Sequence, residues 1–258
     1  MTLGQFTIYL LCVPLFLIFA SAVPGRHQRA GSPLSGREAI FCFLAALGLL
    51  YLGNLLGGLA ADTVGSLLGR EIPDTLTEST GDMSSLQLIL TSVFAAPLIE
   101  ELLFRKMFLD KTAYLGEQSA ILVSGLLFGL MHGNLYQFFY AAGIGWLLAW
   151  IYVRSGSIGI CILYHMLINF CGSLLPQILY GLAYGSRTLM MLLLGGQFVL
   201  ILLSALTTLG LLIHVLRTPV LQPSPGDRGL AGGLARLCLQ PGALLLAAAL
   251  LLDFYMQL

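Results

Sequence analysis

Two adjacent acidic residues, Glu100 and Glu101, interrupt a stretch of the chain that is otherwise apolar and ends at Arg105. A charged side chain at the centre of a lipid bilayer costs at least about 2.5 kcal/mol. Such carboxylates persist in a membrane segment when they line a water-filled cavity, find partners or take part in chemistry. The pair therefore marks a candidate site, and two histidines from later apolar stretches, His132 and His165, are its other candidate members.

The helical spacing of these residues assigns different roles to the two glutamates. Residues four apart lie on one face of a helix, so Arg105 can neutralise Glu101. Glu100 is rotated by about 100° from Glu101 and has no cation nearby in the sequence. A carboxylate buried without a cation holds a proton more readily than a solvated one, which suits a general base or acid. We therefore expect a structural Glu101 and a reactive Glu100.

A second helical pair, His165 and Asn169, is also four residues apart and shares a face. An imidazole and a carboxamide side by side can both donate hydrogen bonds, as an oxyanion hole in acyl transfer requires. Taken singly, His132 or His165 is equally consistent with a simple interhelical hydrogen bond, and Asn169 with helix packing. The combination of these residues in one chain is what indicates an active site.

The composition predicts an all-α fold, a polytopic membrane helical bundle. Of the 258 residues 58% are hydrophobic and 9% are charged, against roughly 25% charged in soluble domains. The net charge is zero, which gives no electrostatic case for nucleic acid. The five cysteines show no paired spacing, which argues against a disulfide framework or a zinc-binding cysteine cluster. We expect a single integral membrane domain over 1–258, with a catalytic core at about 85–175.

Eight apolar stretches approach the roughly 20 residues that a membrane-spanning helix needs. Ten of the twelve Lys and Arg residues fall in alternate connections between them. The positive-inside rule then makes those connections cytoplasmic and places both termini outside. The connection 61–85 is expected outside, with a short surface helix or lid, and 218–233 is expected to be a flexible cytoplasmic loop. The predicted spans are 3–23, 38–60, 86–109, 118–133, 135–153, 157–180, 189–216 and 240–257.

Three motifs on separate predicted spans resemble those of the CPBP intramembrane proteases. They are Glu100-Glu101-Leu-Leu-Phe-Arg105, Phe128-Gly-Leu-Met-His132 and His165-Met-Leu-Ile-Asn169. This family comprises the type II CAAX prenyl proteases and bacterial proteins linked to bacteriocin processing and self-immunity. The resemblance covers about 85–175. It implies an eight-helix fold whose intramembrane cavity opens to the cytosol and in which a peptide bond is hydrolysed.

The resemblance also implies a role for each motif residue. Glu100 would activate water with help from His132, and His165 and Asn169 would stabilise the oxyanion. Glu101 with Arg105 would hold the helix of the first glutamate in place. The partners would be membrane lipid and a peptide or protein substrate, a lipidated one included, and the location would be a bacterial cell membrane.

Three alternatives stay open. The first is a zinc-dependent version of the same protease, a metalloendopeptidase. Its zinc ligands would be Glu100, His132 and His165, which would leave one coordination position for water. We favour metal-free catalysis without a cofactor, because the chain lacks a His-Glu-x-x-His signature and a separate acidic base. A proton-coupled carrier would use the same residues as a relay, although no inverted repeat is visible. A non-catalytic scaffold or immunity protein would keep the fold alone. The sequence names neither the substrate nor the oligomeric state.

Overall fold

The computed structural model describes residues 31–81, 83–112, 116–217, 229–238, 248–253 and 255–256, and these residues form helices without a strand. Within them, five helices are long and apolar enough to cross a membrane, and a sixth, shorter apolar helix is Glu117–Met131. The prediction of an all-α membrane bundle is confirmed. The predicted span 3–23 and the start of 240–257 lie outside the described residues. The five long helices are Gly36–Leu68, Ser85–Thr112, Leu135–Ser155, Ile158–Ala183 and Arg187–Ile213.

Helix α3 (Gly36–Leu68) begins at an N-terminal capping box, in which Ser35 and Glu38 satisfy each other's backbone N–H groups. It ends at Gly69, which has a positive φ of 69°. The sequence prediction ended this span at residue 60 and was therefore too short. The helix continues because small residues, Ala61 and Gly65, remain buried along the same face.

The central helix is α9 (Leu135–Ser155), which packs against both α3 and α8 (Glu117–Met131). A Cβ atom at Gly53 or Gly57 of α3 would collide with the backbone of α9, so these two helices meet at their backbones. Gly125 and Gly129 bring α8 equally close to α9. These glycines thus position α9, the first turns of which carry part of the site.

A sharp turn connects α8 and α9. The predicted span was 118–133, and α8 ends at Met131. Gly133 has a φ of 72°, which only glycine adopts without strain. Asn134 then caps α9, because its side chain accepts a hydrogen bond from the backbone N–H of Gln137 at 2.9 Å.

Two of the long helices contain wide, π-helical turns. The first consists of α5 (Ser85–Leu88), η2 (Ile89–Ala95), α6 (Ala96–Glu101), η3 (Leu102–Leu109) and α7 (Asp110–Thr112). The second consists of α10 (Ile158–Asn169), η5 (Phe170–Leu174) and α11 (Leu175–Ala183). Both η2 and η5 end just before a proline, Pro97 or Pro176, which cannot donate the next backbone hydrogen bond. Such π-helical turns are frequent at functional sites.

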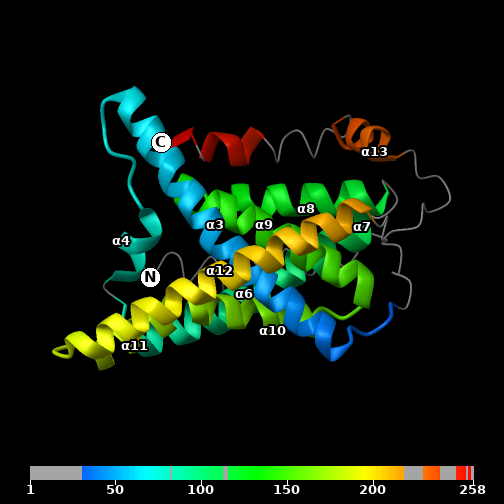
Figure 1. The fold of residues 1–258 in the computed structure, drawn as a ribbon. Coiled ribbons are helices and arrows are strands. Elements are labelled where there is room, and N and C mark those ends of the chain that lie inside the picture. The colour runs from blue at the N-terminus through cyan, green and yellow to red at the C-terminus, as the bar shows by residue number, and fades with distance from the viewer. Residues whose placement is uncertain are drawn as a thin grey trace.

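The remaining helices complete the bundle around this core. In Figure 1, α12 (Arg187–Arg217) runs beside α3, where Thr208 Oγ1 donates to the Ala45 carbonyl at 3.0 Å. The short helix α4 (Thr75–Gly81) forms within the connection 61–85, as predicted. The prediction of a loop at 218–233 was wrong for residues 229–233, which start α13 (Gly229–Cys238). Residues 218–228 of that predicted loop lie outside the described residues.

Candidate active site

The side chains of Glu101 and Arg105, four residues apart, form a fully buried ion pair. Arg105 Nε lies 2.9 Å from Glu101 Oε2, and Arg105 Nη2 donates to Glu101 Oε1 at 3.3 Å. Arg105 Nη1 also donates to Ser124 Oγ at 3.2 Å. The guanidinium carbon lies 5.2 Å from the centroid of the Phe128 ring, within cation–π range. The structure thus contains the contact that the sequence spacing predicted, and neither partner touches solvent.

His165 is nearly buried and connects the two glutamates. Its Nδ1 lies 2.9 Å from Glu101 Oε1, and its Nε2 lies 3.7 Å from Glu100 Oε2. An ionised carboxylate only accepts hydrogen bonds, so His165 Nδ1 carries a proton when Glu101 is charged. With His165 protonated on both nitrogens and both carboxylates ionised, these three groups and Arg105 sum to zero charge. The sequence did not reveal the contact between Glu101 and His165, which are 64 residues apart.

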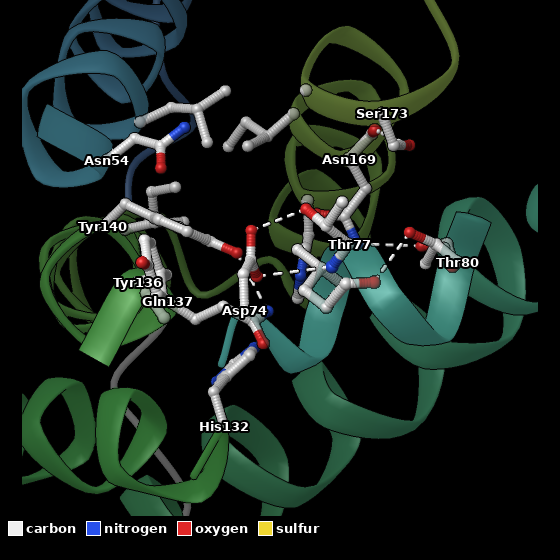
Figure 2. Close-up of a pocket in the computed structure, with 18 of the residues that line it drawn as sticks. Asn54, Asp74, Thr77, Thr80, His132, Tyr136, Gln137, Tyr140, Asn169 and Ser173 are labelled. Atoms are coloured by element: carbon white, nitrogen blue, oxygen red, sulfur yellow. Dashed lines mark hydrogen bonds between the residues drawn. The ribbon is translucent and has the colours of Figure 1, made fainter. Parts of the chain in front are cut away.

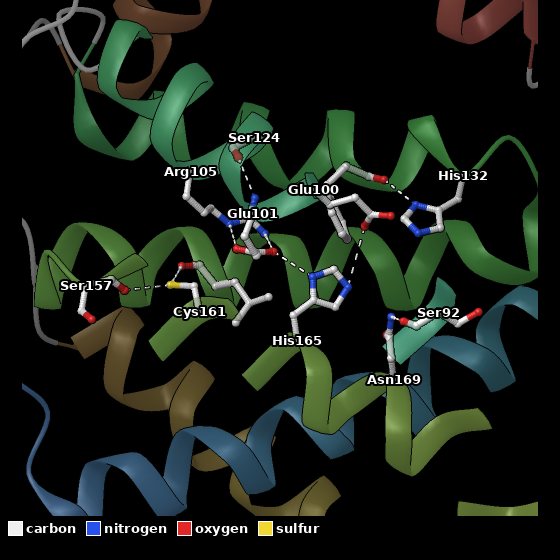
Figure 3. A network of polar contacts seen from close by, with 12 residues as sticks. Ser92, Glu100, Glu101, Arg105, Ser124, His132, Ser157, Cys161, His165 and Asn169 are labelled. Atoms are coloured by element: carbon white, nitrogen blue, oxygen red, sulfur yellow. Dashed lines mark hydrogen bonds and ion pairs between the residues drawn. The ribbon is translucent and has the colours of Figure 1, made fainter. Parts of the chain in front are cut away.

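His132 caps the C-terminal end of α8 and has a defined tautomer. Its Nδ1 lies 2.7 Å from the Phe128 carbonyl oxygen. Because a carbonyl can only accept, Nδ1 must be the donor, and a neutral His132 presents the lone pair of Nε2. Figure 3 shows the Glu100 carboxylate between the rings of His132 and His165. The Glu100 carboxylate therefore lies next to the lone pair of His132 Nε2 and next to His165 Nε2, which donates when both ring nitrogens of His165 are protonated.

Phe128 holds the two imidazoles in place. Its ring meets those of His132 and His165 edge-on, with centroid separations of 5.1 and 5.6 Å. Such edge-to-face contacts contribute roughly 0.5–1.5 kcal/mol each beyond simple burial. The sequence showed Phe128 only as one end of a spacing with His132, and its contact with His165 appears only in the structure.

Asn169 uses one of its amide hydrogens within the protein. Its Nδ2 donates to the backbone carbonyl of Ser92, in η2, at 2.8 Å. A carboxamide nitrogen carries two hydrogens, so one remains for a bound group. We expected His165 and Asn169 to offer donors from one face, and both do line one cavity. The involvement of Ser92 was not foreseen, since nothing in its local sequence distinguishes it.

A cavity of about 410 Å³ brings the predicted residues together. Its wall includes Glu100, His132, His165 and Asn169, whereas Glu101 and Arg105 lie behind the wall. This volume falls within the range of roughly 300–1,000 Å³ that is usual for small-ligand pockets. Further polar residues that line the cavity are labelled in Figure 2: Asn54, Asp74, Thr77, Thr80, Tyr136, Gln137 and Tyr140.

Helix α4 closes this cavity at one end and is fixed beside His132. Asn134 Nδ2 donates to Thr75 Oγ1 at 3.1 Å and to the His132 carbonyl at 3.3 Å. The Tyr136 hydroxyl donates to the Ile72 carbonyl at 3.4 Å, just before α4 begins. The short helix that the sequence predicted in this connection therefore lies over the site, held by the turn that carries His132.

The described residues do not offer an evident metal centre. Among them, no group of three or more His, Cys, Asp or Glu side chains is arranged to hold a metal ion. In both cavity histidines the Nδ1 atom already faces an oxygen of the protein, the Phe128 carbonyl or Glu101.

A comparison with known protein families finds a match over this site. Residues 82–171 of the 258 match the family described as type II CAAX prenyl endopeptidase Rce1-like. All six predicted site residues fall inside this matched segment, as does the turn that fixes α4. The match supports the resemblance to the CPBP proteases that the three motifs carry.

One relative matches over a longer part of the chain than the family segment. The Bacillus subtilis (strain 168) protein named "Putative membrane peptidase YdiL" is 24% identical over 166 residues, which cover 62% of this chain. The match spans 66% of the relative's own length, just under two thirds. No solved structure matches the chain.

Proposed function

We propose that this protein is an intramembrane endopeptidase, which hydrolyses a peptide bond in a peptide or protein substrate, lipidated substrates included. The observation that carries the proposal is the single cavity lined by Glu100, His132, His165 and Asn169. A carboxylate next to an acceptor imidazole, facing two hydrogen-bond donors, is what water-mediated acyl transfer requires. The match to a peptidase family over the same residues supports the proposal.

In the proposed reaction, Glu100 takes a proton from a water molecule, assisted by the free Nε2 of His132. The water oxygen attacks the substrate carbonyl carbon, and the carbonyl oxygen gains negative charge. The Nε2–H of a His165 protonated on both ring nitrogens and the second hydrogen of Asn169 stabilise this oxyanion. The C–N bond then breaks as Glu100 returns the proton to the leaving amine. Glu101 keeps His165 Nδ1 protonated and the ring oriented, as a carboxylate does for the histidine of a catalytic triad.

Cleavage of a fluorogenic peptide by purified protein in lipid, with Glu100→Ala beside the wild type, tests this function. Wild-type cleavage that the variant lacks is the expected result. Proton or ion flux without cleavage would instead identify a carrier. A protein with neither activity that still binds a partner would be a scaffold or immunity protein.

We propose that hydrolysis needs no metal or other cofactor. The expected result is that EDTA or ortho-phenanthroline leaves the initial cleavage rate unchanged. His165→Ala and Asn169→Ala should each lower kcat by roughly 10²- to 10³-fold, the loss typical of one oxyanion donor. If zinc were required, His165→Ala would lose metal while Asn169→Ala would retain both metal and activity. One zinc per chain, removed and restored in step with activity, would contradict the metal-free proposal.

Two of the sequence-based orientation predictions differ in which side of the membrane they assign to this cavity. The cavity extends from the middle of the bundle to α4, at the end opposite the basic residues Lys106, Lys111 and Arg154. The positive-inside rule places those residues in the cytoplasm, whereas the family resemblance implied a cavity open to the cytosol. We propose the charge-derived orientation, in a bacterial cell membrane, with both termini and the cavity end outside.

Cysteine labelling in intact cells checks this orientation. Tyr184→Cys, at an exposed position on the cavity side, should react with a membrane-impermeant maleimide. Ser32→Cys, at the opposite end, should react only after the cells are permeabilised. The wild type supplies the background from the native cysteines. The reverse pattern would place the cavity end in the cytosol.

A further inference from the structure

We infer that Pro97 is a positioning residue for Asn169. Proline has no backbone N–H, so the backbone carbonyl of Ser92 lacks its π-helical donor and accepts a hydrogen bond from the Asn169 side chain, which orients that side chain. The inference rests on the proposed peptidase function. Two observations meet here: the 2.8 Å hydrogen bond from Asn169 Nδ2 to the Ser92 carbonyl, and the complete burial of Pro97. Ser92 and Asn169 are 77 residues apart, so this bond joins the two helices that carry the site.

The backbone pattern of η2 explains why the Ser92 carbonyl is available. At the end of this π-helix, the N–H of Ala96 donates to the carbonyl of Thr91, five residues back. The next bond in the same pattern would run from residue 97 to Ser92. Residue 97 is a proline and has no N–H. The side chain of Asn169 supplies the hydrogen bond that this partly buried carbonyl lacks within its own helix.

This hydrogen bond decides how Asn169 faces the cavity. The carboxamide is planar, so fixing one N–H on Ser92 also fixes the plane and the direction of the second N–H. An unrestrained carboxamide could turn by 180° and present its oxygen, which would repel a developing oxyanion. Pro97 therefore acts through Asn169 and does not touch the substrate, which is why its role is positioning.

A second proline provides a matched control. Pro176 follows η5 in the same way, and Leu175 N–H donates to the Phe170 carbonyl five residues back. Pro176 does not line the cavity, although it lies in the helix that carries His165 and Asn169. Pro97→Ala and Pro176→Ala thus restore the same backbone N–H at two equivalent positions, only one of which is linked to Asn169.

Side-chain amide NMR tests the contact without any activity measurement. The chain has three asparagines, Asn54, Asn134 and Asn169, so ¹⁵N-asparagine labelling gives three pairs of amide signals, and Asn169→Ala identifies one pair. In the wild type, one Asn169 hydrogen should be shifted downfield and exchange slowly. Pro97→Ala should abolish this difference, and Pro176→Ala should preserve it. Wild-type Asn169 signals typical of a free amide, or signals unchanged by Pro97→Ala, would overturn the inference.

A double-mutant cycle measures the functional link. Pro97→Ala should lower kcat about tenfold with KM unchanged, a part of the loss expected for one oxyanion donor. In the Asn169→Ala background, Pro97→Ala should have no further effect on kcat. An equal loss in both backgrounds would show that Pro97 does not act through Asn169. A wild type that cleaves no peptide would refute the proposed function, and the NMR experiment would still decide the contact.

Discussion

Glu100→Gln abolishes peptide hydrolysis while the protein remains folded. The amide is nearly isosteric with the carboxylate but cannot take a proton from water, and a positioned general base contributes roughly 10²- to 10⁴-fold to a rate. Among the described residues, Glu100 has a single ion-pair contact, with His165 Nε2 at 3.7 Å, so the loss of its charge should cost little stability. Cleavage rates and thermal melting of the purified variant in lipid measure both quantities.

The matched control for this substitution is Glu71→Gln, which makes the same chemical change at an exposed position before α4. It should leave both the cleavage rate and the melting temperature at their wild-type values. If Glu100→Gln retained substantial activity, Glu100 could not be the base. His132, with its free Nε2, would then be the remaining candidate in the cavity wall.

Glu101→Gln should lower both the melting temperature and the cleavage rate. Glu101 is fully buried between Arg105 and His165, and the substitution leaves the guanidinium without a counter-charge. Removing one partner of a buried ion pair typically costs about 3–5 kcal/mol. The rate falls for a second reason, because a neutral amide no longer fixes the protonation and orientation of His165. Thermal melting and single-turnover kinetics of the variant measure the two effects separately.

Two further variants show whether the stability loss comes from the unpaired charge. Glu101→Gln combined with Arg105→Met should recover part of the melting temperature, because the lone buried cation is gone, but not the rate. Glu38→Gln, which affects the exposed ion pair with Arg154, should leave the melting temperature nearly unchanged. If Glu101→Gln matched the wild type in both rate and melting temperature, the buried ion pair would have neither role.

The two contacts of Glu101 show which contacts helical spacing can predict and which it cannot. The interval from Glu101 to Arg105 predicted their contact, because residues one turn apart in a helix are neighbours whatever surrounds the helix. The same spacing could not show that Glu101 also contacts His165 at 2.9 Å. That contact depends on the depth and crossing angle at which α6 and α10 meet. The glycines that bring α8 and α9 together were visible in the sequence, but the helices they would meet were not.

The wide helical turns are a second reason why the sequence could not complete the site. A π-helical turn adds a residue to the repeat, so the side chains after it point in directions that a period of 3.6 does not predict. η2 lies before the glutamates, and its Ser92 carbonyl receives Asn169 from another helix. The position of α4 over the cavity likewise depends on hydrogen bonds from Asn134 and Tyr136 to a distant segment.

By itself, the sequence determined that the protein is a bundle of membrane helices and which six polar residues are its candidate site. Both follow from local physics: apolar length decides which segments suit a bilayer, and the cost of burying charge singles out the residues kept there. Only the tertiary structure decided that Glu101 holds His165, that Ser92 holds Asn169, and that α4 covers the cavity. These contacts join residues from segments far apart in the sequence. They depend on how the helices pack, and the spacing of residues along the chain does not show that packing.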